Sequence, residues 1–261
     1  MHYISLQLSD LGLALVFIAI SWAISYWQRL GIEKDLLWGA IRAFLQLMAV
    51  GYILQAVFDL RRWYLVLLII LIMTGIAGYN AYLRQKSRWR GLAFILFISI
   101  GTGSILTILT VTGLILRVRP WYLPQYIIPI AGMIIGNAMT GAALATNRLS
   151  SELTQHRLEI EAALALGASS RQATAPYLRE ALKTAMIPTI NSMMIVGIVQ
   201  LPGMMTGQII AGTPPAEAVR YQVMVVYMIA SATAITCIVT TLWAYRAYFT
   251  PAHQLKVGGP S

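Results

Sequence analysis

Seven stretches of about 20 or more mostly apolar residues divide this chain, and they constrain its fold more than any other feature. A helix needs about 20 such residues to cross the hydrocarbon core of a bilayer. Of all residues, 58% are hydrophobic and only 11% are charged, whereas a soluble domain carries roughly 25% charged residues. We therefore predict an all-α, polytopic membrane protein with seven transmembrane helices. The spans are expected at about residues 9–27, 36–57, 63–82, 91–116, 124–146, 184–212 and 219–245.

The basic residues predict how these spans are oriented. The net charge is +10, and most Lys and Arg residues stand in short segments between the apolar runs. Cytoplasmic loops of membrane proteins are enriched in these two residues. With the N-terminus outside and Arg42 left aside, 13 basic residues fall on the inner side and 5 on the outer side. We expect an outer N-terminus, a cytoplasmic C-terminus and a multi-pass location in the cell (inner) membrane. Topology and contacts with membrane lipids explain the positive charge without a nucleic-acid partner.

No long polar linker separates the spans, so residues 1–261 are expected to form one transmembrane domain. Its sizeable cytoplasmic element is the segment at about 147–183, whose pattern indicates a helix, a turn and a second helix. Gly167 is suited to end the first helix, and Ser169 with Gln172 forms a capping-box pattern for the second. The first helix repeats aliphatic residues at near-helical spacing: Leu149, Leu153, Ile160 and Leu164.

Residues 161–168, with the sequence EAALALGA, resemble the EAA loop of ABC transporter permeases. In that loop, small residues let a short helix lie in a groove of the ATPase, and glycine permits the sharp turn. An alanine-rich helix that ends in glycine is also common without this role. The resemblance implies that the residues coupling the permease to its ATPase are Glu159, Glu161, Ala162, Ala163 and Gly167.

Further segments resemble signatures of the FetB-type permease family: IPIAGMIIGNAM at 128–139, IPTINSMM at 187–194, LPGMMTGQ at 201–208, AVRYQ at 218–222 and RAFLQL at 42–47. The resemblance extends from about residue 6 to 245. The family includes bacterial proteins assigned to iron export and plant aluminium-tolerance permeases. It implies a permease, expected as a homodimer, that is paired with a separate cytoplasmic ABC ATPase.

The chain contains no G-x-x-x-x-G-K-[ST] phosphate-binding loop, which agrees with that implication. We therefore expect no enzyme activity and no cofactor in this chain, with ATP hydrolysis on a partner. Two other interpretations stay open. A secondary transporter or channel usually carries ionisable residues within its spans, and they are nearly absent here. A seven-helix photoreceptor needs a lysine in its last span, and 219–245 has none.

Methionine and amide side chains in the fifth and sixth spans are candidates for a substrate pathway. Thioether sulfur suits soft or borderline metals, and amide oxygen suits harder ones. The same residues also serve packing, because methionine fills irregular gaps and asparagine forms interhelical hydrogen bonds. No set of metal ligands is assigned. The candidates are Asn137, Met139, Asn191, Met194, Met204, Met205 and Gln208.

Three more features carry alternatives. The Leu201-Pro202-Gly203 segment breaks the sixth span, either as a gate or binding element or as a simple outer-leaflet kink or re-entrant turn. Arg42 either reaches the headgroups or faces a polar interior together with Gln46. The G-x-x-x-G patterns at 132–136 and 203–207 permit close helix approach, within one chain or at a dimer seam.

Overall fold

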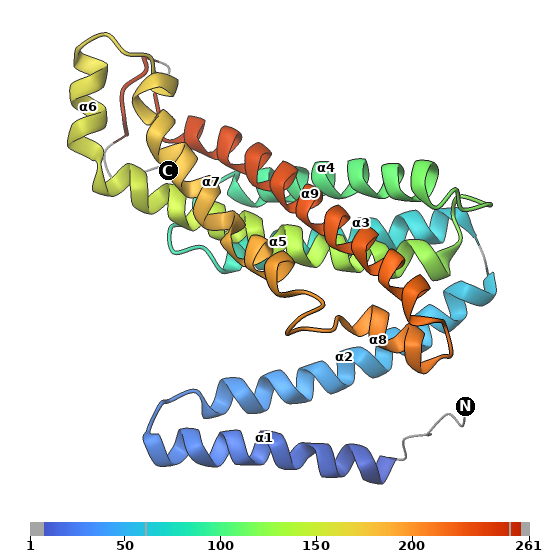
Figure 1. Cartoon of the computed structure of the whole chain (residues 1–261). Helices are drawn as coiled ribbons and strands as arrows, with labels where there is room; N and C mark the ends of the chain where they lie inside the picture. The colour runs from blue at the N-terminus through green and yellow to red at the C-terminus, as the bar shows by residue number, and fades with distance from the viewer. Residues whose placement is uncertain (1–7, 61, 251, 257–261) are drawn as a thin grey trace. The chain divides into compact units, whose positions relative to one another are not determined.

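A computed structural model describes residues 8–60, 62–250 and 252–256. The chain divides into two compact units, residues 1–61 and residues 62–261. Within the described residues every regular element is a helix (Figure 1), which confirms the predicted all-α class. The expectation of one membrane domain stays a prediction.

The first unit is a helix pair, α1 (Leu8–Gln28) and α2 (Glu33–Leu60). The turn between them includes Gly31, whose φ of +74° favours glycine. Ser25 Oγ donates to Glu33 Oε1 at 2.8 Å and ties the end of α1 to the start of α2. Arg42 and Gln46 are exposed on α2 within this unit. Both interpretations of Arg42 therefore stay open.

The second unit contains the other helices. Among the described residues of the whole chain, five helices are long and apolar enough to cross a membrane: α2, α3, α4 continued by η1, α5 and α9. The elements of the second unit are α3 (Trp63–Leu83), α4 (Leu92–Leu109), the π-helical η1 (Thr110–Ile115), α5 (Pro124–Gln155), α6 (Arg157–Ala165), α7 (Ser170–Ile195), α8 (Gly203–Ile210) and α9 (Pro215–Ala247).

Small residues let α9 approach α4 and α5 closely. A Cβ atom added at Gly103 on α4 would overlap Thr236 Oγ1 and lie 2.8 Å from the Ala232 carbonyl oxygen. One added at Gly141 on α5 would lie 2.6 Å from Thr233 Cγ2. Helix association in membranes depends on such backbone proximity, because apolar side chains gain little by leaving lipid. The core of this unit is therefore a tight α4–α9–α5 contact.

The predicted G-x-x-x-G patterns do not make this contact. Within the described chain, a Cβ atom at Gly136, Gly203 or Gly207 would meet nothing within 4 Å. One at Gly132 would meet only the end of the Met73 side chain, at 3.4 Å. Gly136, Gly203 and Gly207 thus make no close helix contact within the described part of the second unit, and both alternatives stay predictions.

The segment predicted as the sixth span, 184–212, is not one continuous helix. α7 is continuous from Ser170 to Ile195, so it joins the second of the two helices predicted at 147–183 to the first half of that segment. The break begins at Val196, before the Pro202-Gly203 pair, and Gly197 adopts a φ of +82° within it. Gly197 N–H donates to the Gln200 carbonyl oxygen at 2.9 Å, so the break is an ordered turn followed by α8.

The first of the two helices predicted at 147–183 also differs from the prediction. α5 continues through 147–155, and the helix is interrupted only at His156, where α6 begins. A helix that is already nucleated adds further residues at little cost, whether they are polar or apolar. Hydropathy therefore marks the end of the apolar segment rather than the end of the helix.

Candidate functional site

The turn between α6 and α7 has the predicted geometry at both of its ends. Gly167 has a φ of +93°, and the N–H groups of Gly167 and Ala168 donate to the carbonyl oxygens of Leu164 and Ala163 at 3.0 Å each. This is the glycine-dependent C-cap of α6. The capping box of α7 is confirmed, because Ser169 and Gln172 bond each other reciprocally. The turn is therefore fixed by hydrogen bonds at both helix ends.

Side chains next to this turn hold α6 against α7. The Tyr177 hydroxyl donates to Glu159 Oε2 at 2.7 Å, and His156 Nδ1 lies 3.0 Å from Glu159 Oε1. The His156 and Tyr177 rings stack with centroids 4.7 Å apart. The hydrogen bonds from Tyr177 and His156 lower the pKa of Glu159, and burial together with Glu159 raises the pKa of Tyr177 to about 12. The carboxylate form of Glu159 thus holds the cluster, which weakens as the pH falls through that lowered pKa.

The predicted coupling residues lie in different surroundings. Glu161 accepts from Arg157 Nε at 2.7 Å on the same helix, and Glu159 is part of the cluster with Tyr177. Ala162 is exposed, whereas Ala163 is half-buried.

The sequence analysis did not predict that Leu158 and Leu166 belong to this surface, and they are 79% and 89% exposed. With Ala162 they follow an i, i+4, i+8 spacing, so α6 presents an uncovered apolar stripe. This spacing is the sequence pattern from which the exposed apolar stripe could have been predicted.

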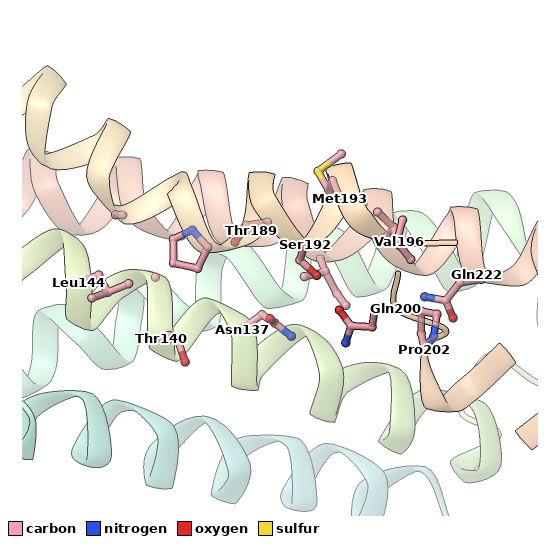
Figure 2. A pocket seen from close by; sticks show the side chains of 15 residues that line it. Asn137, Thr140, Leu144, Thr189, Ser192, Met193, Val196, Gln200, Pro202 and Gln222 are labelled. Carbon is pink, nitrogen blue, oxygen red and sulfur yellow. The ribbon is translucent and has the colours of Figure 1, made fainter. Parts of the chain in front are cut away.

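A pocket of about 250 Å³ lies between α5, α7 and α9 (Figure 2). The irregular segment after α7 borders one end of it through Val196, Gln200 and Pro202. In Figure 2, Gln200 and Gln222 lie at the end next to Pro202. The polar side chains in the lining are all uncharged: Asn137, Thr140, Thr189, Ser192, Gln200 and Gln222.

Some polar side chains in this lining already make hydrogen bonds within their own helix. Asn137 Nδ2 donates to the Met133 carbonyl oxygen at 2.8 Å, which leaves its Oδ1 available. The Thr140 hydroxyl donates to the Gly136 carbonyl oxygen at 3.2 Å and keeps its lone pairs. On α9, Gln222 is only 7% exposed, and its buried Oε1 has no hydrogen-bond partner among the described residues. Thr189, Ser192 and Gln200 add hydroxyl and amide groups that can donate, so the lining offers a ligand both donors and acceptors.

One of the sequence-predicted pathway residues, Asn137, lines this pocket. The sequence pattern missed Thr189, Ser192, Gln200 and Gln222, because isolated hydroxyl and amide residues give no signal of convergence. The other candidates lie outside the lining. They are the half-buried Met139 on α5, the exposed Asn191 and Met194 on α7, and the half-buried Met204, Met205 and Gln208 on α8.

No group of three or more His, Cys, Asp or Glu side chains that could hold a metal ion occurs in the part of the chain that the structure describes. Charged side chains are also missing from the pocket lining. The polar groups that this lining offers to a ligand are therefore uncharged hydroxyl and amide groups.

Comparisons with known proteins cover almost the whole chain. The model of an uncharacterised protein family, UPF0014, matches residues 8–249. The probable iron export permease protein FetB of Escherichia coli is 38% identical over 251 residues, which are 95% of this chain and 94% of that protein. The UPF0014 membrane protein STAR2 of rice is 40% identical over 93% of this chain and 84% of its own length. A UPF0014 membrane protein of Synechocystis is 40% identical over 97% of this chain and 98% of its own length. No solved structure matches.

Proposed function

Because this chain belongs to the UPF0014 family, we propose that it is the membrane-spanning subunit of an ABC transporter that exports a metal ion such as iron, or another small solute. Its relatives are named as membrane proteins, and together with the long apolar helices they make this chain a multi-pass membrane protein. The name of the Escherichia coli relative supports the permease role and the metal substrate. The missing phosphate-binding loop supports a separate ATPase.

The observation that carries the proposal is the continuity of α7. Its first residue adjoins the ordered α6–α7 turn, and its last turn lines the pocket through Ser192 and Met193. In the proposed mechanism an ATPase subunit docks on α6 and this turn. Closure of the ATPase then moves α7 and changes access to the pocket between the two sides of the membrane. The permease acts as a homodimer with two ATPase subunits, seven spans per chain, an outer N-terminus and a cytoplasmic C-terminus.

The ATPase partner is tested by co-expression with a cytoplasmic ABC ATPase subunit from the same organism. We expect the two proteins to co-purify, and ATP hydrolysis to be faster in the complex than with the ATPase alone. Iron(II) supplied outside inverted vesicles, on their cytoplasmic face, should accumulate inside them only when ATP is present on that face. Transport without an ATPase would contradict the proposal and favour a secondary transporter or channel.

The orientation is tested with single cysteines and a membrane-impermeant thiol reagent in intact cells. A cysteine at Thr154, near the end of α5, should be protected, and one at Pro215, the first residue of α9, should react. The native Cys237 is buried and serves as an unreactive background. The opposite labelling pattern would overturn the proposed topology.

A further inference from the structure

A second pocket, of about 440 Å³, opens between α9 and the wall formed by α4 and η1. Its floor is buried and includes Thr107, Val111 and Met228. Exposed side chains such as Leu106 and Tyr227 form its rims, so the pocket is a groove in the surface of the second unit. A groove at membrane depth is filled by lipid or by protein, because an empty one loses the contacts on its open side.

The groove follows α9 for about the depth of one leaflet. Its lining on α9 extends from Arg220 to Ile235, which is about 22 Å at 1.5 Å per residue. One leaflet of the hydrocarbon core is about 15 Å deep, half of about 30 Å. On the opposite wall, Gly103 packs beside Ala232, near the Ile235 end, so Ile115 lies toward the Arg220 end.

Between its two ends the groove offers mainly hydrocarbon surface. The hydroxyl groups of Thr107 and Thr110 donate to the carbonyl oxygens of Gly103 and Leu106, at 2.9 and 2.8 Å. These hydroxyl groups are thus satisfied within their own wall of the groove. Most of the other lining side chains in this stretch are aliphatic or methionine. Such a surface suits an acyl chain, which needs shape and contact but no polar partner.

The Arg220 end of the groove is positively charged. Arg220 is exposed and makes no ion pair within the part of the chain that the structure describes. Arg117 and Arg119 follow Ile115 by two and four residues, and both are exposed. Glu217, the nearest carboxylate along α9, lies outside the lining. The proposed topology places all three arginines outside, where the enrichment of basic residues in cytoplasmic loops does not account for them.

We propose that this groove binds one anionic phospholipid, with the phosphate on Arg220 and one acyl chain lying between α9 and the α4–η1 wall. A guanidinium group donates two parallel N–H bonds to phosphate oxygens. Arg117 and Arg119 add attraction for a headgroup with a net negative charge. The π-helical η1 belongs to the wall, and π-helical segments are frequent at functional sites. The inference rests on the membrane location of the chain and not on the metal substrate or the ATPase.

The test uses purified full-length protein that is delipidated in detergent and then given equal amounts of phosphatidylglycerol and phosphatidylcholine. Native mass spectrometry counts the lipids that each chain retains. We expect one phosphatidylglycerol per chain, preferred about fivefold over the zwitterionic lipid, and no displacement by millimolar inorganic phosphate, which has no acyl chain. Equal retention of the two lipids, or displacement of the lipid by inorganic phosphate, contradicts the inference.

An arginine pair tests the headgroup contact. Arg220→Gln should lower the retention of phosphatidylglycerol by about tenfold, the effect of losing a charge-assisted hydrogen bond. Arg62→Gln is the matched control, because Arg62 is also exposed, precedes α3 on the proposed outer side and lies outside the lining. Retention that is unchanged in Arg220→Gln, or lowered equally in both variants, overturns the inference.

A tryptophan pair tests the place of the acyl chain. Ser231→Trp fills the groove from its exposed rim and should lower the retention of both lipids, whereas Ile238→Trp, on α9 outside the lining, should not. If Ser231→Trp retains phosphatidylglycerol and instead separates the protein into smaller oligomers on size-exclusion chromatography, a second copy of the chain covers the groove and the inference is wrong.

Discussion

Replacing Gly103 with valine should prevent α4 from packing on α9 and leave little folded protein in the membrane fraction. The Cβ atom alone would overlap Thr236 Oγ1 and approach the Ala232 carbonyl oxygen to 2.8 Å. A side-chain hydroxyl can rotate away, but a helix carbonyl can move only if the whole helix shifts. Overpacking of this kind costs about 3 kcal/mol or more. The midpoint of thermal unfolding in detergent, followed by size-exclusion chromatography, measures the effect.

Gly75→Val on α3 is the control, because a Cβ atom there meets nothing within 4 Å. It should change stability by about 0.5 kcal/mol or less. Gly103→Ala should be less harmful in a Thr236→Ala background than in the unaltered chain, since the nearest atom is then removed. Equal stability of the Gly103 and Gly75 valine variants would mean that α4 and α9 are not in close contact.

Gly167→Pro should abolish most of the stimulation of ATP hydrolysis by the permease while the protein stays inserted. Proline fixes φ near −65°, whereas Gly167 has a φ of +93°, and it removes the N–H that donates to Leu164. The C-cap of α6 is then lost, and the apolar stripe on α6 no longer points in a fixed direction. We expect stimulated hydrolysis to fall by about tenfold, or about 1.4 kcal/mol in the activation free energy.

Gly167→Asn is the matched control for this prediction. Asparagine tolerates the left-handed conformation better than other non-glycine residues and keeps the backbone N–H. It should retain most of the stimulation, and both variants should elute as intact protein. If the proline variant stimulates the ATPase as well as the asparagine variant does, the α6–α7 turn is not the surface that couples the two subunits.

The sequence predicts the long apolar helices well, because the thickness of a bilayer sets a minimum length that composition reveals directly. The expected spans at 36–57, 63–82 and 219–245 lie within α2, α3 and α9. The helices around the sixth predicted span have other boundaries than predicted, for a physical reason. α7 contains Pro176 and Pro188 and much polar sequence, and both prolines are accommodated within a continuous helix. Proline and hydropathy therefore give the wrong boundaries there.

In the candidate sites, too, some features could be predicted from the sequence and others could not. The capping box at Ser169 and the glycine turn at Gly167 are local, so their geometry follows from neighbouring residues. The pocket depends on residues far apart in the sequence, because Gln222 and Asn137 line the same pocket only after α5 and α9 have packed together. The turn that borders the pocket depends on Gly197, a residue without any distinctive sequence pattern. Convergence of this kind requires the tertiary structure.

The unbroken course of α7 also has a mechanical consequence. Its 26 residues form an arm about 39 Å long. If the arm pivots near its middle, a tilt of about 10° carries its two ends about 3 Å in opposite directions. That distance is about the diameter of a water molecule. A small push at the end next to α6 is therefore enough to widen or narrow the space beside the opposite end by about one layer of water, without any change in the helix itself.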